Sequence, residues 1–395
     1  MDKPKNVTYL LGAGASANAL PVVSIWGTRL EQFSSYLDSL NSSYCDEKGI
    51  DIEKVKAEIK ELLNDANNHA TIDHYARKLF IKSSKEEPVQ SLKEGSGRRL
   101  LSLKHFLGCF FSFEQNRIES FWENFGYIDE DGKEHAYQLS DSFEGQKVQV
   151  DPRYDVFFAK LLDSNSMGLD ERVSIISWNY DLQLELAYKD FNEKDNPQVM
   201  LGVHPNAYDI NEEKLREQGR RFQVIKLNGS AGLVHTPTRY PPIMRGLTGH
   251  FFPVSDRSDN VTFQEFVELR VPTIEALLTI YSNFLNRNPQ IEPSLRFAWE
   301  DKGELDKSVK YLQEILPNTA TLVVIGYSFP DFNKSIDKEI LKMLPSGCKI
   351  YYQDSKERVD GLIQRLKGLF LTQGKEFPPI EPYTDLDQFF IPYEL

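Results

Sequence analysis

The segment 7–16, which reads VTYLLGAGAS, constrains the fold of this chain more than any other. Its apolar and β-branched run stops at Gly12, and Gly14 and Ala17 complete a G-x-G-x-x-A pattern. Glycines in such a turn let the backbone approach a pyrophosphate, and the N–H groups opening the next helix face its negative charge. A tight turn without a ligand gives the same pattern, so its meaning depends on the rest of the chain. The candidate phosphate-binding residues are Gly12, Ala13, Gly14, Ala15 and Ser16.

Four later segments also have strand character, because each is a short apolar run that ends at a polar or glycine position. They are Val173–Ser177, Phe222–Leu227, Thr321–Ile325 and Cys348–Tyr352. Helical patterns alternate with them at Leu182–Lys189, Thr262–Leu285, Leu305–Ile315, Asn333–Met343 and Lys356–Phe370. Short buried strands alternating with helices predict an α/β fold with a Rossmann-like, doubly wound parallel sheet.

The stretch 28–165 lacks strand patterns and separates the first strand from the others. We predict a mostly helical insertion over 28–165, and an α/β domain formed by residues 1–27 and 166–395. Inside the insertion we expect helices at Asp51–Asn68 and Leu100–Phe113. We expect an exposed loop at Lys82–Arg99 and a hairpin at Tyr127–Val150.

Composition argues against several classes of protein. The formal net charge of −13 over 395 residues disfavours sequence-independent binding of nucleic acid. No stretch approaches the ~20 apolar residues of a membrane span. Cys45, Cys109 and Cys348 are isolated, so we expect neither a disulfide framework nor a Cys₄ zinc site. Since no signal-peptide pattern precedes the first strand, we expect a cytoplasmic protein without membrane contact.

Polar clusters follow the other predicted strands at the point where each ends: SWNYD at 177–181, KLNGS at 226–230, GYSFPD at 326–331 and QDS at 353–355. In a parallel sheet, ligands bind beyond the carboxyl ends of the strands. Each cluster could instead have a purely structural role, since Asp181 suits a helix cap and Asn228-Gly229 suits a turn. Their convergence on one sheet edge, beside a glycine loop, favours a ligand site.

The ordered set LLGAGAS, SWNYD, KLNGS and GYSFPD resembles the sirtuin-like NAD-binding proteins of bacteria. It is most similar to the branch that hydrolyses NAD⁺ in anti-phage defence. Within the insertion, TIDHYA at 71–76 is similar to a segment of some members. The resemblance implies an NAD⁺ glycohydrolase that uses NAD⁺ as its substrate and no metal. It also implies a homo-oligomer and a separate partner protein such as a HerA-like ATPase or a short Argonaute.

The resemblance also implies roles for individual residues. Asn179 matches the catalytic Asn, which holds a water and the nicotinamide ribose near the scissile bond. Asp181 matches an Asp near the nicotinamide carboxamide pocket. The glycine loop would bind the pyrophosphate, and other residues would complete the NAD site: Trp178, Gly229, Ser230, Gly326, Tyr327, Ser328 and Asp354.

Two departures from the family pattern bear on activity. The chain lacks the Cys₄ zinc module and the Pro-Asp-Phe-Arg segment of the deacylases, which disfavours lysine deacylation. Asn228 stands where the family has the His regarded as its general base, and Asn cannot accept a proton at neutral pH. His204 and His235 are alternative bases, although a core or surface role suits each of them.

Three functions therefore remain open. The first is NAD⁺ hydrolysis by an NAD-depleting effector. The second is a catalytically impaired subunit that binds NAD or ADP-ribose as a sensor or in assembly. A Rossmann-type oxidoreductase is the third, and the strand ends supply no residues suited to hydride transfer.

Overall fold

The computed structural model describes most of the chain. The described residues are 6–21, 26–40, 42–47, 49–115, 126–128, 134–136, 150–192, 197–205, 212–217, 220–235, 274–286, 292–300 and 302–395.

Seven parallel strands form the central sheet, in the order β11-β10-β9-β1-β4-β6-β5. The strands β4, β5 and β6 lie on one side of β1, and β9, β10 and β11, which follow later in the chain, lie on the other. This arrangement confirms the predicted doubly wound α/β fold. The strands are β1 (Asn6–Leu11), β4 (Val173–Ser177), β5 (Val203–His204), β6 (Val224–Lys226), β9 (Thr319–Ile325), β10 (Lys349–Gln353) and β11 (Ile380–Tyr383).

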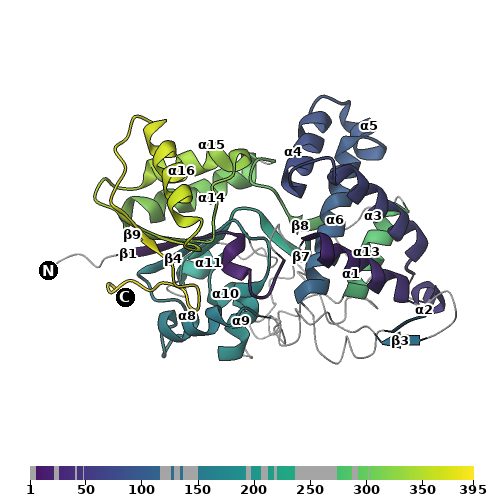
Figure 1. The fold of residues 1–395 in the computed structure, drawn as a ribbon, viewed down its shortest axis with the longest axis horizontal. Coiled ribbons are helices and arrows are strands. Elements are labelled where there is room, and N and C mark those ends of the chain that lie inside the picture. Colours follow the sequence, from purple (N-terminus) through teal and green to yellow (C-terminus); the bar gives the residue numbers. More distant parts are fainter. Residues whose placement is uncertain are drawn as a thin grey trace.

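Helices cover both faces of the sheet, because successive side chains of each buried strand point to opposite faces. Leu10 belongs to the core on one face, whereas Tyr9 and Leu11 belong to the core on the other. The first face packs against α11 (Glu212–Glu217), α14 (Lys302–Ile315), α15 (Lys334–Met343) and α16 (Val359–Leu371), with η5 (Leu316–Asn318) leading into β9. The second packs against α8 (Arg153–Leu161), α9 (Gln183–Phe191) and α10 (Pro197–Met200) (Figure 1).

A separate group of helices, here called the helical lobe, stands beside the sheet in Figure 1. Its central helix, α6, is buried on nearly every side, with Leu103, Phe106 and Phe110 fully inaccessible to solvent. The lobe consists of α1 (Trp26–Ser39), α2 (Ser42–Glu47), α3 (Ile52–Ala66), α4 (Ile72–Ser83), α5 (Pro88–Lys93), α6 (Ser96–Gln115) and α13 (Ile274–Leu285). The antiparallel pair β7 (Gly229–His235) and β8 (Glu292–Leu295) adds Ala231 and Leu295 to the same core.

The packing differs from the predicted division of the chain in two places. Helix α13 joins the core of the helical lobe although it lies outside 28–165. Helix α8 lies inside that range, but Tyr154, Phe157 and Phe158 pack it against the sheet. Burial of these aromatic faces, rather than position in the sequence, decides which core each helix joins.

The loop predicted at Lys82–Arg99 contains a helix, so that prediction is wrong. Helix α5 forms there because the Glu87 side chain accepts a hydrogen bond from Gln90 N and Pro88 opens the first turn. The predicted hairpin is described only at its pairing strands, β2 (Gly126–Ile128) and β3 (Glu134–Ala136), which are antiparallel. Residues 262–273 of the predicted helix 262–285 lie outside the described residues.

The segment 384–395 follows β11 and lies against the α8 side of the sheet. Phe389 is 2% exposed and contacts the rings of Tyr154 and Phe157 at centroid distances of 4.9 and 5.5 Å. Arg172 Nη1 donates to Glu394 O at 2.7 Å. This segment therefore completes the core beside α8. Within the described part of the chain, no helix is long and apolar enough to span a membrane.

Candidate functional site

The glycine loop after β1 is bound to the loop after β9 by direct backbone contact. Gly12 N donates to Ile325 O and Gly14 N to Gly326 O, both at 3.0 Å. A Cβ on Gly12 would lie 2.5 Å from Tyr327 Cα, and one on Gly14 would lie 2.7 Å from Gly326 Cα. Gly326 itself has a φ of 59°, which favours glycine. The glycines are thus required by the contact between two loops, and the four-residue η1 (Ala13–Ser16) follows directly.

If this loop binds a nucleotide, as the sequence predicts, Gly14→Val should weaken NAD⁺ binding and also destabilise the fold. The new side chain would push the Gly326 loop away from β1, at a typical overpacking cost of about 1–3 kcal/mol in free energy of unfolding. Calorimetric titration with NAD⁺ and thermal unfolding measure the two effects. Gly361→Ala in α16 is the control, because its Cβ meets nothing within 4 Å and should leave both quantities undiminished. Unchanged affinity in the Gly14 variant would contradict a nucleotide site on this loop.

Asn179 joins the end of β4 to the glycine loop. Its Nδ2 atom donates to Gly12 O at 2.9 Å and lies 3.4 Å from Ser16 Oγ. The residue is 9% exposed. Within the described residues, its Oδ1 atom accepts no hydrogen bond from the protein. One end of this amide therefore fixes the loop, while the other remains available to a ligand.

Asp181 and Lys226 form a buried polar group beside Asn179. Burial raises the pKa of Asp181, whereas Lys226 and a hydrogen bond with Ser16 act in the opposite direction. Lys226 Nζ donates to Asp181 O at 2.5 Å and to Glu185 Oε1 at 3.0 Å, and the Lys226 and Glu185 side chains are almost fully buried. Asp181 Oδ1 also accepts from Gln183 N, the first residue of α9, at 3.0 Å, but Leu182 rather than Asp181 holds the N-cap position of that helix.

Trp178 and Tyr327 stack across the glycine loop, with ring centroids 5.6 Å apart and planes 13° apart. Beneath them, Tyr327 OH donates to Asp337 Oδ1 at 2.9 Å, and Asn333 Nδ2 donates to Tyr327 OH at 3.1 Å. Asn333 ends η6 (Asp331–Asn333) and Asp337 lies in the first turn of α15. These contacts fix the loop after β9, where sequence predicted the adenosine side of the site.

Burial raises the pKa of Asp337 to about 8, although the Tyr327 and Trp178 side chains oppose this shift. In the unfolded chain the pKa of an Asp is about 4. Between these values the unfolded chain loses a proton that the folded chain keeps, so raising the pH favours unfolding. We expect the contribution of Asp337 to the free energy of unfolding to fall between pH ~4 and pH ~8. The decrease should be up to ~1.4 kcal/mol per pH unit.

Asp337→Asn should remove this part of the pH dependence, because the amide keeps an acceptor for Tyr327 OH and does not titrate. Urea unfolding at several pH values in that interval measures the slope. Asp360→Asn is the matched control, since Asp360 is exposed in the first turn of α16 and should leave the slope unchanged. An identical slope in the wild-type protein and the Asp337 variant would refute a protonated Asp337.

Asn228 lies at the end of β6, and both ends of its side-chain amide are bonded to backbone. Nδ2 donates to Trp178 O at 2.8 Å, and Oδ1 accepts from Ala298 N at 3.1 Å. Gly229 has a φ of 63°, and a Cβ there would lie 2.3 Å from Ser294 O. The adjacent Ser230 is 1% exposed. This cluster connects to the glycine loop through Trp178.

Asp354 and Ser328 follow β10 and β9, on the opposite side of β1 from β4 and β6. Asp354 ends β10, two strands away, where Oδ1 accepts from Ser355 N at 2.8 Å. The Ser328 carbonyl accepts from Arg365 Nη1 at 2.9 Å. Both contacts fix loops at the carboxyl edge of the sheet, so a nucleotide would have to extend from η1 past β9 to reach Asp354.

The structure describes the side chain of only one of the two alternative bases, His204 and His235. His204 lies on β5, at the far edge of the sheet from β9, between the rings of Phe222 and Tyr311 at centroid distances of 5.2 and 4.7 Å. This aromatic packing fits a core role. The His235 side chain lies outside the described residues.

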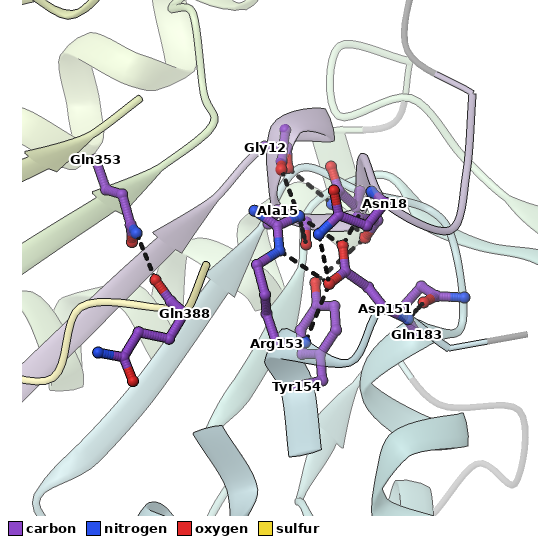
Figure 2. A network of polar contacts seen from close by, with 12 residues as sticks. Gly12, Ala15, Asn18, Asp151, Arg153, Tyr154, Gln183, Gln353 and Gln388 are labelled. Atoms are coloured by element: carbon purple, nitrogen blue, oxygen red, sulfur yellow. Dashed lines mark hydrogen bonds and ion pairs between the residues drawn. The ribbon is translucent and has the colours of Figure 1, made fainter. Parts of the chain in front are cut away.

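An ion pair between Asp151 and Arg153, which was not predicted from sequence, lies behind the glycine loop. Arg153 Nη2 donates to the carbonyl oxygens of Gly14 and Ala15 at 3.0 and 3.1 Å, as Figure 2 shows. Tyr154 OH lies 3.2 Å from Ser16 Oγ. No motif marks these residues, because they stand at the start of α8 rather than after a strand.

A carboxylate contributed by the helical lobe was likewise not predicted from sequence. Burial raises the pKa of Asp73, in the first turn of α4, to about 6. Asp73 acts electrostatically on Tyr180, which packs against the core of the lobe. Helix α4 also contacts the loop after β9, since Arg77 Nη1 donates to Phe332 O at 3.0 Å. The segment TIDHYA thus places a titratable group beside the end of β4.

No protein-family model matches this chain, and no curated protein matches it. Among the described residues, no cluster of His, Cys, Asp or Glu side chains could hold a metal ion.

Proposed function

We propose that this chain is an NAD⁺ glycohydrolase that converts NAD⁺ and water into nicotinamide and ADP-ribose. The observation that carries the proposal is the bonding of Asn179, whose amide joins the candidate catalytic position directly to the loop expected to hold the pyrophosphate. A nucleotide bound over η1 would therefore have its scissile end near Asn179. This position is the carboxyl edge of a doubly wound sheet, where such folds bind ligands.

The chemistry requires few groups. The bond between C1′ of the ribose and the nicotinamide nitrogen breaks, nicotinamide leaves as a neutral molecule, and the water oxygen bonds to C1′ while its proton is released. Asn179 Oδ1 can accept a hydrogen bond from the water or from a ribose hydroxyl and so hold attack geometry. In this proposal the ionised form of the buried Asp181 stabilises the positive charge that develops on the ribose.

A second candidate is favoured by the environment of Asn228. Because its amide bonds to Trp178 O and Ala298 N, it serves the packing of β4, β6 and the segment after β8. It also cannot act as a general base. A catalytically impaired subunit that binds NAD or ADP-ribose as a sensor, or in assembly, would have this arrangement.

Incubation of the purified protein with NAD⁺, followed by chromatographic separation of the products, tests the two candidates. Stoichiometric nicotinamide and ADP-ribose support the glycohydrolase. Saturable NAD⁺ binding without products supports the binding subunit. Formation of NADH from NAD⁺ when an alcohol is added as hydride donor, without release of nicotinamide, would instead indicate an oxidoreductase.

The biological setting is part of the same proposal. We propose that the protein acts in the cytoplasm as an NAD-depleting effector of anti-phage defence, as a homo-oligomer with a partner such as a HerA-like ATPase or a short Argonaute. Sequence resemblance supports this setting, and the net charge of −13 fits a protein that contacts nucleic acid only through such a partner.

A further inference from the structure

The far side of the glycine loop is held by a buried ion pair. Arg153 Nη2 donates to the carbonyls of Gly14 and Ala15, and Nε and Nη2 bond to Asp151 at 2.8 and 2.5 Å. Asp151 Oδ2 accepts from Asn18 N at 3.1 Å, just beyond η1. The pair therefore binds the loop at two successive carbonyls and again at the residue where the loop ends.

This arginine is placed to orient the loop rather than to attract phosphate. The side chains of Arg153 and Asp151 are 5% and 0% exposed, so their opposite charges cancel at close range. In a trans peptide, the C=O and N–H groups point to opposite sides. Holding the Ala15 carbonyl toward Arg153 therefore directs the Ser16 N–H away from it.

The guanidinium group rests on a ring from the segment 384–395. Arg153 Cζ lies 5.0 Å from the centroid of the Phe389 ring, within the range of cation–π attraction. The same ring meets Tyr154 edge-on at 4.9 Å, and Tyr154 OH contacts Ser16 Oγ at 3.2 Å. Phe389 thus supports both residues that contact the loop from behind.

Gln353 fixes the position of Phe389. Its Nε2 atom donates to Asp385 O at 2.5 Å and to Gln388 O at 2.7 Å, and its Oε1 atom accepts from Phe390 N at 3.0 Å. Figure 2 shows the bond between Gln353 and Gln388 on the opposite side of Arg153 from Asp151. The end of β10 is thereby connected, through 385–390 and Arg153, to the loop after β1.

We propose that Arg153 and Phe389 are positioning residues, through which the segment 385–390 sets the conformation of the glycine loop and hence its affinity for the NAD pyrophosphate. The statement about affinity rests on the proposed function. The statement about loop conformation does not.

Phe389→Leu tests the proposal, with Phe370→Leu as the matched control. Both phenylalanines are buried, at 2% and 3% exposure, but Phe370 packs on the other face of the sheet. In the Phe389 variant we expect amide hydrogen exchange at residues 13–17 to quicken, and ADP-ribose affinity to weaken, each by at least ~5-fold. The control should lose similar thermal stability and change neither quantity.

Arg153→Lys gives a second measurement, because lysine keeps the charge opposite Asp151 but loses the fork that reaches two carbonyls. A double variant should carry both Arg153→Lys and Phe389→Leu. Its loss of ADP-ribose affinity should be smaller than the product of the two single-variant losses, since both residues act through one contact. Loop exchange that is the same in the Phe389 and Phe370 variants would overturn the positioning role. If the unaltered protein binds neither NAD⁺ nor ADP-ribose, the proposed function fails, and hydrogen exchange still decides the role of Phe389.

Discussion

Asn179→Ala is expected to reduce NAD⁺ hydrolysis by ~10²–10³-fold, the usual loss when one positioned polar group is removed from a transition state. The variant loses Oδ1, which can hold the water or the ribose, and the Nδ2 hydrogen bond to Gly12 O. The free energy of unfolding should fall by only about 1 kcal/mol, as for one typical hydrogen bond. Initial rates of nicotinamide release and urea unfolding measure the two effects.

Gln223→Ala provides the matched control for this variant. Gln223 has the same 9% exposure, and its Nε2 atom also donates to backbone carbonyls, those of Asp170 and Val173. It differs in lying at the opposite, amino end of β4. We expect a similar loss of stability with little change in turnover. Near-normal turnover in the Asn179 variant would refute its catalytic role.

Asn228→His should raise NAD⁺ turnover by at least ~10²-fold if the wild-type chain is slow for want of a general base. An imidazole can keep a donor toward Trp178 O and present its other nitrogen to the ribose, whereas an amide cannot take up a proton. NAD⁺ affinity should change little, since the glycine loop is untouched. Steady-state kinetics and calorimetry separate the rate from the affinity.

Asn228→Gln distinguishes proton transfer from altered packing. Glutamine disturbs the same contacts to Trp178 O and Ala298 N but supplies no base, so it should not raise turnover. A gain that is equal in both variants would contradict the general-base explanation. Should the wild-type protein already be fast, with no gain from histidine, another group supplies the base. Asp73 would then be the next residue to replace, because its pKa of about 6 suits that role.

The sheet could be predicted from sequence because its inner strands are buried on both faces. Val173–Ser177 is a short segment rich in β-branched residues that is buried along its whole length, and β4 has those same bounds. The edge strand β11 was not predicted, since Ile380–Tyr383 is short, half exposed and contains Pro382. Helix α5 was also missed, because capping by Glu87 outweighs the polar composition that suggested a loop.

The candidate site could be predicted only where it follows strands. Asn179 was placed at the sheet edge because it follows a buried strand, whereas its catalytic role was implied only by the resemblance; its contact with Gly12 is consistent with the placement. Arg153 opens α8, and its contact with the glycine loop is made to Gly14, 139 residues away in sequence. Nor could sequence show that both ends of the Asn228 amide bond to backbone, because Ala298 lies 70 residues away.

The contact between Gly14 and Gly326 has a consequence for protein synthesis. The loop after β1 is made first, but the backbone that holds Gly12 and Gly14 in place belongs to residues 325 and 326. While the ribosome has yet to release β9, the first strand has only one of its two neighbours. If the chain is the proposed NAD⁺ glycohydrolase, we expect a nascent chain to be unable to consume NAD⁺ until most of its length has emerged, which would protect the producing cell during translation.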